Sequence, residues 1–393
     1  MKIPLMKCAF SHEEETKRKL AEFIISAPRL SMDKQCAMFE KEFSTYQGQR
    51  DGIFFNSGGS ANLAMFQALK NLGLLKNGDK IGFSALTWST NLMPIIQLGM
   101  EPVAVDCDSH TLNVMSHNLK KRLADTKLQA LFITNALGFA GDLDEIKNIC
   151  HENKMLLLED NCEALGTELK NGGKTGTFGG MASFSFFVAH HMSTVEGGMI
   201  CTDNSEYAEM LRIVRANGWD RNLTPAQQEK WRARYGVGSE FEAKYTFFDL
   251  GFNLRPNEMT GFLGRSQLKY LPENVIKRQE HYLRLEKTML SNPDLLGFTH
   301  DHIKLLSNFA FPVMCKSMEL REKYVSIFEK AGVEARPMIA GNIQKQPFYK
   351  KYVSKLYELP GADAVHDCGF YCGNCPELND EELNIIADAL RKK

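Results

Sequence analysis

The sequence lacks a long apolar run: none of its apolar segments approaches the ~18 to 20 residues that span a bilayer. Its amino terminus, Met1-Lys-Ile-Pro-Leu-Met-Lys-Cys-Ala-Phe10, carries charges where a secretory signal peptide has its apolar stretch. These two absences argue against a membrane-spanning and against a secreted protein. We therefore expect a cytoplasmic protein.

The chain also has little net charge and no evident disulfide framework. Its 47 basic and 48 acidic residues give a formal charge of −1, which provides neither a basic surface for nucleic acid nor an acidic tail. The ten cysteines are mostly scattered through apolar segments, a pattern typical of reduced, buried thiols. We expect a small-molecule substrate, no nucleic acid or membrane partner, and a reducing compartment.

Length and patterning indicate two α/β units. The 393 residues suffice for one large α/β domain and a smaller C-terminal domain, which we place at 1–270 and 271–393. Between about residues 52 and 200, short apolar runs alternate with amphipathic stretches. This alternation predicts an α/β fold with a mostly parallel central sheet covered by helices on both faces. Ligands of such sheets gather at the carboxyl ends of the strands.

The expected elements follow this rhythm. In the first part we predict strands at 53–55, 80–83, 102–105, 130–134 and 155–159, and helices at 60–72, 91–98 and 143–153. In the second part we predict helices at 254–270, 274–290, 318–331 and 380–390. Residues 223–244, rich in Gln, Glu, Lys and Arg, indicate a polar loop or a short helical insertion.

One segment carries the strongest functional signal. It reads Ser183-Phe-Ser-Phe-Phe-Val-Ala-His190-His191-Met-Ser-Thr-Val-Glu196-Gly-Gly198. It resembles the cofactor-anchoring segment of the sugar-modifying aminotransferases of the DegT/DnrJ/EryC1/StrS family. In that family an S-F-S-F block leads into a lysine, and a Glu-Gly-Gly turn begins six residues after the lysine. Six residues before Glu196 stands His190.

The resemblance covers roughly residues 29–390. It implies the fold type I pyridoxal-phosphate architecture, similar to aspartate aminotransferase, with a smaller C-terminal α/β domain. The family lysine holds pyridoxal phosphate as a Schiff base and moves the proton that completes transamination. Imidazole moves a proton near neutral pH but forms no stable imine with the aldehyde. The resemblance therefore implies non-covalent pyridoxal 5'-phosphate and pyridoxamine 5'-phosphate, with His190 as the catalytic base.

Within the family, the His-His form is most similar to the branch that acts as a 3-dehydratase on GDP-4-keto-6-deoxy-D-mannose. The base removes a proton from the C4' carbon of the cofactor, and the C3 hydroxyl of the sugar leaves as water. L-glutamate regenerates the cofactor, and the products are a 3-deoxy-4-keto sugar and ammonia. The sequence does not decide whether the nucleotide of the substrate is GDP or CDP, or whether its sugar is of the mannose or the heptose type.

A related histidine-bearing branch holds an iron–sulfur cluster, whose cysteines follow the histidine motif. This chain has no cysteine between Cys201 and Cys315, so it lacks the defining feature of that branch. Two alternatives remain. One is a nucleotide-sugar 4-aminotransferase in which histidine serves in place of lysine. The other is a catalytically inactive, cofactor-binding relative.

Three residues match contacts to the cofactor ring. Asp160 ends an apolar strand and matches the carboxylate that pairs with the pyridine nitrogen, although an acidic residue there could equally cap a helix. Glu163 matches a residue that reaches the 3-hydroxyl of the ring or the base. Trp88 matches the aromatic residue that stacks on the ring, whereas an isolated tryptophan is usually part of the core.

A turn of small residues, Asn56-Ser-Gly58-Gly59-Ser60, joins a strand to a helix. Such a turn brings backbone N–H groups close to a phosphate, although most turns of this kind only cap a helix. It resembles the phosphate cup of the family, which assigns Gly58, Gly59 and Ser60 to the phosphate. Ser185 matches a second phosphate ligand.

Asn253 matches an asparagine that family members lend across a dimer interface to the cofactor phosphate of the partner. The resemblance therefore implies a homodimer with shared active sites. Arg221, Arg255 and Arg336, together with Arg215, could meet the diphosphate of a substrate, although exposed arginine is usually only a solvated charge.

Two local features have simpler explanations. His366, Cys368, Cys372 and Cys375 have the residue types of a zinc or iron–sulfur site, but no second cysteine pair closes it, and we expect no metal. His191 is either an orienting neighbour of the base or a packing histidine.

Overall fold

The centre of the protein is a seven-stranded sheet, which the computed structural model describes within residues 2–391. Its strands, in the spatial order β1-β8-β7-β5-β4-β2-β3, are β1 (Asp51–Phe55), β2 (Lys80–Ser84), β3 (Glu101–Val105), β4 (Ala130–Thr134), β5 (Leu156–Asp160), β7 (Met181–Ser185) and β8 (Gly198–Thr202). Neighbouring strands from β7 through β5, β4 and β2 to β3 are parallel, whereas β8 is antiparallel to β7 and β1. The predicted mostly parallel sheet is confirmed.

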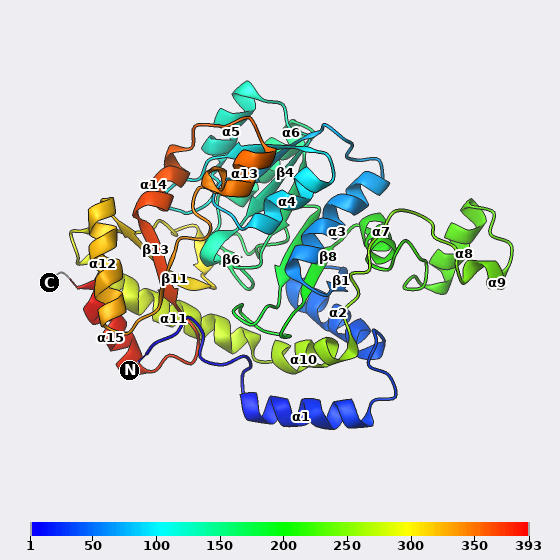
Figure 1. Ribbon diagram of the computed structural model, residues 1–393, viewed down its shortest axis with the longest axis horizontal. Helices are drawn as coiled ribbons and strands as arrows, with labels where there is room; N and C mark the ends of the chain where they lie inside the picture. The colour runs from blue at the N-terminus through cyan, green and yellow to red at the C-terminus, as the bar shows by residue number, and fades with distance from the viewer. Residues whose placement is uncertain (1, 392–393) are drawn as a thin grey trace.

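Helices connect the strands and cover the sheet (Figure 1). They are α3 (Gly58–Asn71), α4 (Ser89–Gln97), α5 (Ser116–Asp125), α6 (Leu143–Glu152) and α7 (Ser205–Arg215). Parallel neighbours need such crossovers, which explains the alternating pattern of the sequence. A one-turn helix, η1 (Ala136–Gly138), follows β4. The predicted strands and helices of this part are confirmed within a few residues.

Three helices outside this alternation form a stack whose inner helix contacts the sheet. They are α1 (Glu13–Ser26), α2 (Lys34–Gln47) and α10 (Glu258–Leu268). Helix α2 buries Phe39 and Phe43 and contacts both β1 and α10. Helix α10 begins at Glu258, four residues later than predicted, because Pro256 precedes it and the side chain of Asn257 caps the N–H of Thr260 at 3.0 Å.

A smaller antiparallel sheet lies toward the carboxyl terminus. Its strands, in the order β12-β13-β11-β9, are β12 (Ala335–Pro337), β13 (Gly369–Gly373), β11 (Ala310–Cys315) and β9 (Leu295–Leu296). Around it lie α11 (Leu271–Leu290), α12 (Met318–Lys330), α14 (Pro360–Cys368) and α15 (Asp380–Leu390), with η2 (Ile343–Lys345) and α13 (Pro347–Tyr352) before α14. A short pair, β6 (Glu168–Leu169) and β10 (Ile303–Leu305), links the two parts. The boundary near residue 270 falls between α10 and α11 and stays a prediction.

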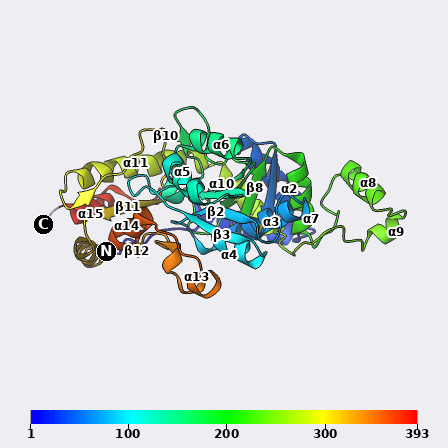
Figure 2. The ribbon, with the colours of Figure 1, turned by 90° about the horizontal axis from the view of Figure 1, so that it is seen from above.

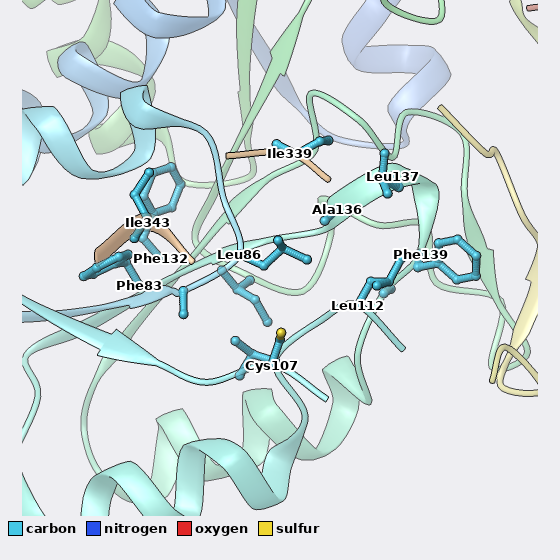
Figure 3. Close-up of a cluster of buried hydrophobic side chains, with 14 of the residues drawn as sticks. Phe83, Leu86, Cys107, Leu112, Phe132, Ala136, Leu137, Phe139, Ile339 and Ile343 are labelled. Carbon is cyan, nitrogen blue, oxygen red and sulfur yellow. The ribbon is translucent and has the colours of Figure 1, made fainter. Parts of the chain in front are cut away.

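The two parts share a core at the carboxyl ends of the central strands. Figure 3 shows Leu86, Leu112 and Leu137 from the loops after these strands, packed with Ile339 and Ile343 from the segment after β12. Each of these side chains is buried. Full burial of one such side chain contributes about 1.5 to 3 kcal/mol. The carboxyl-terminal part is therefore fixed over the edge of the sheet where ligands are expected.

The polar segment 223–244 forms a short helical insertion, as one of the two predicted readings had it. Helices α8 (Pro225–Arg234) and α9 (Glu240–Ala243) project away from the rest of the molecule (Figures 1 and 2). Thr224 and Gln227 form a capping box at the start of α8. Within residues 2–391, no helix is both long and apolar enough to cross a membrane.

Candidate active site

Asp160 is the best-anchored polar residue at the carboxyl ends of the central strands. It is the last residue of β5, is 4% exposed, and has hydrogen-bond donors on both carboxylate oxygens. Its Oδ2 accepts from Nδ2 of Asn62 at 2.9 Å and from Nδ2 of Asn91 at 2.8 Å, and its Oδ1 accepts from the N–H of Cys162 at 2.9 Å. The bond to Cys162 shows that the Asp160 side chain also stabilises the turn that follows β5. The two amides show that the carboxylate is also held from α3 and α4.

Sequence reasoning missed Asn62 and Asn91. Both are buried within the first two turns of their helices, and a buried polar side chain needs a hydrogen-bond partner. Asn91 also donates to Oγ1 of Thr134 at 3.1 Å, and that hydroxyl lies 2.6 Å from Oγ1 of Thr87. An amide among apolar neighbours on a helix face was the available signal, although it does not identify the partner.

The turn of small residues forms the amino-terminal end of α3. Ser57 is the N-cap: its Oγ accepts from the N–H of Ser60 at 3.0 Å and donates to Oγ of Ser60 at 2.9 Å. A Cβ atom at Gly58 would lie 2.8 Å from Cβ of Ser185, and one at Gly59 would lie 3.1 Å from Cγ2 of Thr90. The structure thus brings Ser185, at the end of β7, against the start of α3. The first N–H groups of a helix have no partner within it and can bind an anion.

Trp88 lies immediately before α4 and is 58% exposed. The alternative that it belongs to the core is therefore wrong. Its carbonyl accepts from the N–H of Asn91 at 3.1 Å, so the backbone of Trp88 is tied to one of the residues that hold Asp160. An exposed indole at this place offers an aromatic face to a ligand.

Glu163 lies in the loop after β5, where its Oε2 accepts from the N–H of Leu137 at 2.9 Å. Burial raises the pKa of Glu163 to about 8, and the nearby Asp160 also raises it. Leu137 has a φ of 56°, an uncommon conformation for a leucine, so this contact holds a strained backbone in place. The raised pKa means that Glu163 can carry a proton near neutral pH.

His190 lies in the loop between β7 and β8 and is partly exposed. Its ring packs against Phe309, with centroids 5.3 Å apart, and its backbone N–H donates to the carbonyl of Phe187 at 2.9 Å. Its Nδ1 is buried and has no hydrogen-bond partner among residues 2–391. Burial, and then the charge of Arg278, lower the pKa of His190 to about 4. A neutral imidazole of this kind can accept a proton.

His191 differs from its neighbour because it is buried and fixed. Its Nε2 lies 2.9 Å from the carbonyl oxygen of Ser307. Burial and the charge of Arg278 keep the pKa of His191 well below its usual value. Its geometry agrees with the alternative that His191 is a packing histidine.

A separate cavity of about 960 Å³ lies beside the loop that carries Asn253. It is lined by Asn253, Arg221 and Arg255, together with Arg29 and Trp219. The guanidinium carbon of Arg221 lies 4.0 Å from the ring centroid of Trp219, and Oδ1 of Asn253 accepts from Nε of Arg255 at 3.1 Å. Two of the three predicted substrate arginines are thus brought together.

Two further arginines, Arg336 and Arg215, are engaged by carboxylates. Arg336 is on β12, where it bonds to the Glu334 carboxylate and stands opposite Tyr371 in the sheet. It does not line the cavity of Arg221. Arg215 does line that cavity, but its guanidinium is paired with Glu40 and donates to the carbonyl of Phe54 at 2.7 Å.

The cysteine-rich segment is split between two elements. Cys368 ends α14, Cys372 lies in β13, and Cys375 follows that strand, all as free thiols. Over the described range of 2–391, no group of three or more His, Cys, Asp or Glu side chains could hold a metal ion.

Comparison with known proteins gives a consistent result. The model of the DegT/DnrJ/EryC1/StrS aminotransferase family matches residues 11–391. A GDP-4-keto-6-deoxy-D-mannose 3-dehydratase from Yersinia pseudotuberculosis is 32% identical over 392 residues, which cover 98% of each chain. The corresponding E. coli enzyme, solved with bound hydrated PLP, superposes with a TM-score of 0.90 at 31% identity, covering 100% of both chains.

Two other solved structures of a GDP-4-keto-6-deoxymannose 3-dehydratase also have TM-scores of 0.90 at 31% identity. One is a mutant with bound GDP-perosamine, and the other contains a trapped PLP-glutamate geminal diamine. Each covers 99% of this chain and is itself covered completely. The family match over nearly the whole chain, together with these similarities, shows that the chain belongs to the DegT/DnrJ/EryC1/StrS aminotransferase family.

Proposed function

We propose that the protein is a pyridoxal-phosphate-dependent 3-dehydratase of a GDP-linked 4-keto-6-deoxy sugar. It replaces the C3 hydroxyl with hydrogen and releases a 3-deoxy-4-keto sugar and ammonia, and L-glutamate regenerates the cofactor. The observation that carries the proposal is His190, which stands where the family pattern has lysine and whose ring is kept neutral. The similarity to 3-dehydratases along nearly the whole chain supports it.

The residues at the carboxyl ends of the strands fit the cofactor. Backbone N–H groups at the start of α3 and the hydroxyls of Ser60 and Ser185 suit its phosphate. A Cβ at Gly58 would fill the space against Ser185, which explains the glycine. Asp160 would hold the protonated pyridine nitrogen, and the exposed ring of Trp88 would stack on the pyridine.

The chemistry divides between these residues and the cofactor. When bound, the cofactor supplies an amine for the C4 ketone of the sugar and a ring that accepts electrons. His190 takes the proton at the C4' carbon, and the C3 hydroxyl leaves as water. Glu163, whose pKa is raised to about 8, can share a proton with the ring hydroxyl. Asp160 would keep the proton on the ring nitrogen, which lets the ring accept electrons.

Histidine in place of lysine also makes the cofactor a non-covalent ligand. No imine can form at position 190, so the binding free energy comes from the phosphate, stacking and Asp160 contacts. Treatment with borohydride should therefore leave the mass of the intact chain unchanged.

The decisive assay combines the purified protein, pyridoxal phosphate, L-glutamate and GDP-4-keto-6-deoxymannose. A dehydratase forms a sugar with one oxygen atom fewer and one ammonia per turnover. A 4-aminotransferase forms an amino sugar without ammonia, and a cofactor-binding relative forms neither product. Parallel reactions with the CDP-linked sugar and with a heptose analogue identify the nucleotide and the length of the sugar.

We further propose a homodimer in which each chain completes the active site of the other. The side chain of Asn253 is exposed and bonds to Arg255 rather than to the phosphate cup of its own chain. The neighbouring cavity, with Arg29, Arg221, Arg255 and Trp219, suits a nucleoside diphosphate: guanidinium groups pair with phosphates and the indole stacks on a base. In the dimer this cavity would hold the nucleotide end of the substrate of the partner.

Mixing two inactive variants tests the shared site. In a heterodimer of an Asn253→Ala chain and a His190→Asn chain, one site contains both changes and the other contains neither. Activity should then partly return after subunit exchange. If Asn253 serves its own chain, every site is defective and no activity returns.

We place the enzyme in the cytoplasm. All ten cysteines are free thiols, which agrees with a reducing compartment. Fractionation of cells that express a tagged chain would test this location.

A further inference from the structure

Arg278 is a buried cation that the proposed reaction does not yet use. It lies on α11 and is 4% exposed. Its guanidinium donates to the carbonyl oxygens of Phe309 and Asn374, each at 2.9 Å, and to that of Asn308 at 3.4 Å. Within residues 2–391 it forms no ion pair with a carboxylate, and its Nε has no hydrogen-bond partner. A buried guanidinium that forms no direct ion pair is costly and points to a function.

The same segment that binds Arg278 also contacts both histidines. The ring of Phe309 packs against His190 at 5.3 Å and against His191 at 6.2 Å between centroids, and the carbonyl of Ser307 bonds to His191. The carbonyl of Phe309 accepts from Arg278. In addition, His190, His191 and Arg278 line one small cavity of about 30 Å³. Arg278 and the two histidines thus share both a small cavity and a neighbour, Phe309.

We propose that Arg278 is a positioning residue that acts through His190 and favours its neutral, proton-accepting form. The proposal rests on the proposed function, in which His190 is the base. In the imidazolium form both ring nitrogens carry hydrogens, and the buried Nδ1–H would have no acceptor. The fixed positive charge of Arg278 adds repulsion in surroundings that screen it little. After His190 has taken a proton, the same repulsion favours passing it on to the departing hydroxyl.

The other titratable groups around the cavity are neutral near pH 7, with one exception. They are Cys8 in the amino-terminal segment, His191, and Cys375 and Glu377 after β13. Burial raises the pKa of Cys8 to about 12 and that of Cys375 to about 11, so both thiols stay neutral near pH 7. His191 is itself held neutral by burial and by Arg278.

Glu377 is the remaining charge around this cavity. Burial lowers the pKa of Arg278 and the charge of Glu377 acts in the opposite direction, but the side chain of Glu377 is partly exposed, where solvent screens its charge. The influences on His190 are burial and Arg278, both of which lower its pKa.

The test measures the titration of His190 itself in the full chain, with and without cofactor. The ring signals of histidine are followed by NMR from about pH 3 to 8, so that the range extends below the expected midpoint, and His190 is assigned from the signal that is lost in His190→Asn. Arg278→Gln keeps donors for the carbonyl oxygens but removes the charge, whereas Arg278→Lys keeps the charge. Arg284→Gln, on an exposed part of the same helix, is the matched control.

In Arg278→Gln, the titration midpoint of His190 should rise on the order of one pH unit, the size expected for one charge acting through protein of effective dielectric near 20. The acid limb of kcat/KM should move by the same amount. Arg278→Lys and Arg284→Gln should leave both midpoints unchanged. If the Gln variant does not fold, Arg278→Met provides the same change of charge with apolar packing.

Equal shifts in the Lys and Gln variants would show a purely structural role and overturn the proposal. A wild-type midpoint near 6.5 would overturn it without any variant. Failure of the proposed function is distinguishable: His190→Asn would then still dehydrate the sugar, while the effect of Arg278 on the titration of His190 would persist.

Discussion

The two polar centres of the candidate site, Asp160 and His190, are supported in opposite ways. Asp160 receives three hydrogen bonds from three different parts of the chain, two of them from buried amides. His190 packs against an aromatic ring, and its Nδ1 has no partner among residues 2–391. The carboxylate of Asp160 is held in place by donors on both oxygens. The imidazole of His190 is left free to gain and lose a proton.

The difference follows from what each group would have to do. A carboxylate that pairs with a ring nitrogen has to keep its position, and donors on both oxygens hold it there. A base must accept and return a proton within each turnover, so strong hydrogen bonds to either form would oppose half of the cycle. The hydrogen-bond pattern of a site can thus separate a static electrostatic role from a proton-transfer role.

Removing the imidazole of His190 should have the largest effect on activity. His190→Asn should lower the rate of sugar dehydration by about 10²- to 10⁴-fold, because the proton acceptor is lost. Cofactor binding, measured by absorbance after gel filtration, should be largely retained, since Asp160 and the start of α3 are intact. His191→Asn should keep the chemistry and lose stability. The reverse result would identify His191 as the base.

Removing the amides of Asn62 and Asn91 tests how strongly Asp160 is supported. Asn62→Ala and Asn91→Ala should each lower the free energy of unfolding by about 1 to 3 kcal/mol, because a buried carboxylate loses a donor. The shift of the urea midpoint measures this loss. Asn148→Ala, at an exposed position of α6, is the control and should change stability by no more than about 0.5 kcal/mol. Wild-type stability in both amide variants would contradict the support of Asp160 by these two amides.

Glu163 sharpens the comparison because it accepts one hydrogen bond, from Leu137, and lies near Asp160. Burial raises the pKa of Glu163 from 4.5 to about 8, so between these pH values the folded chain holds a proton that the unfolded chain has released. The free energy of unfolding should therefore fall as pH rises through this window, by at most about 1.4 kcal/mol per pH unit.

Glu163→Gln removes this titration. The variant should lose less stability than wild type between pH 5 and 8, as measured by urea denaturation of the cofactor-free protein. Parallel pH profiles for the two proteins would show that Glu163 is ionised throughout and that its pKa is not raised.

Much of the fold was predictable because its signals are local. The apolar runs that became β2, β4 and β5, and the amphipathic stretches between them, read directly as strands and helices. The small-residue turn before α3 and the histidine segment after β7 are likewise continuous in sequence. The start of α10 was predicted four residues too early, because the helical pattern begins before the N-cap residue Asn257, where the helix itself begins.

The sequence by itself determined the α/β alternation, the residues of the small-residue turn, and the exchange of lysine for histidine at position 190. Only the tertiary structure decided which side chains support them. Asn62 and Asp160 are 98 positions apart, and Asn91 and Asp160 are 69 positions apart. Arg278, on α11, donates to the carbonyl oxygen of Phe309, and the ring of Phe309 packs against His190. Such partners are selected by proximity in the folded chain, where burial makes each hydrogen bond and each charge count, and no local spacing records them.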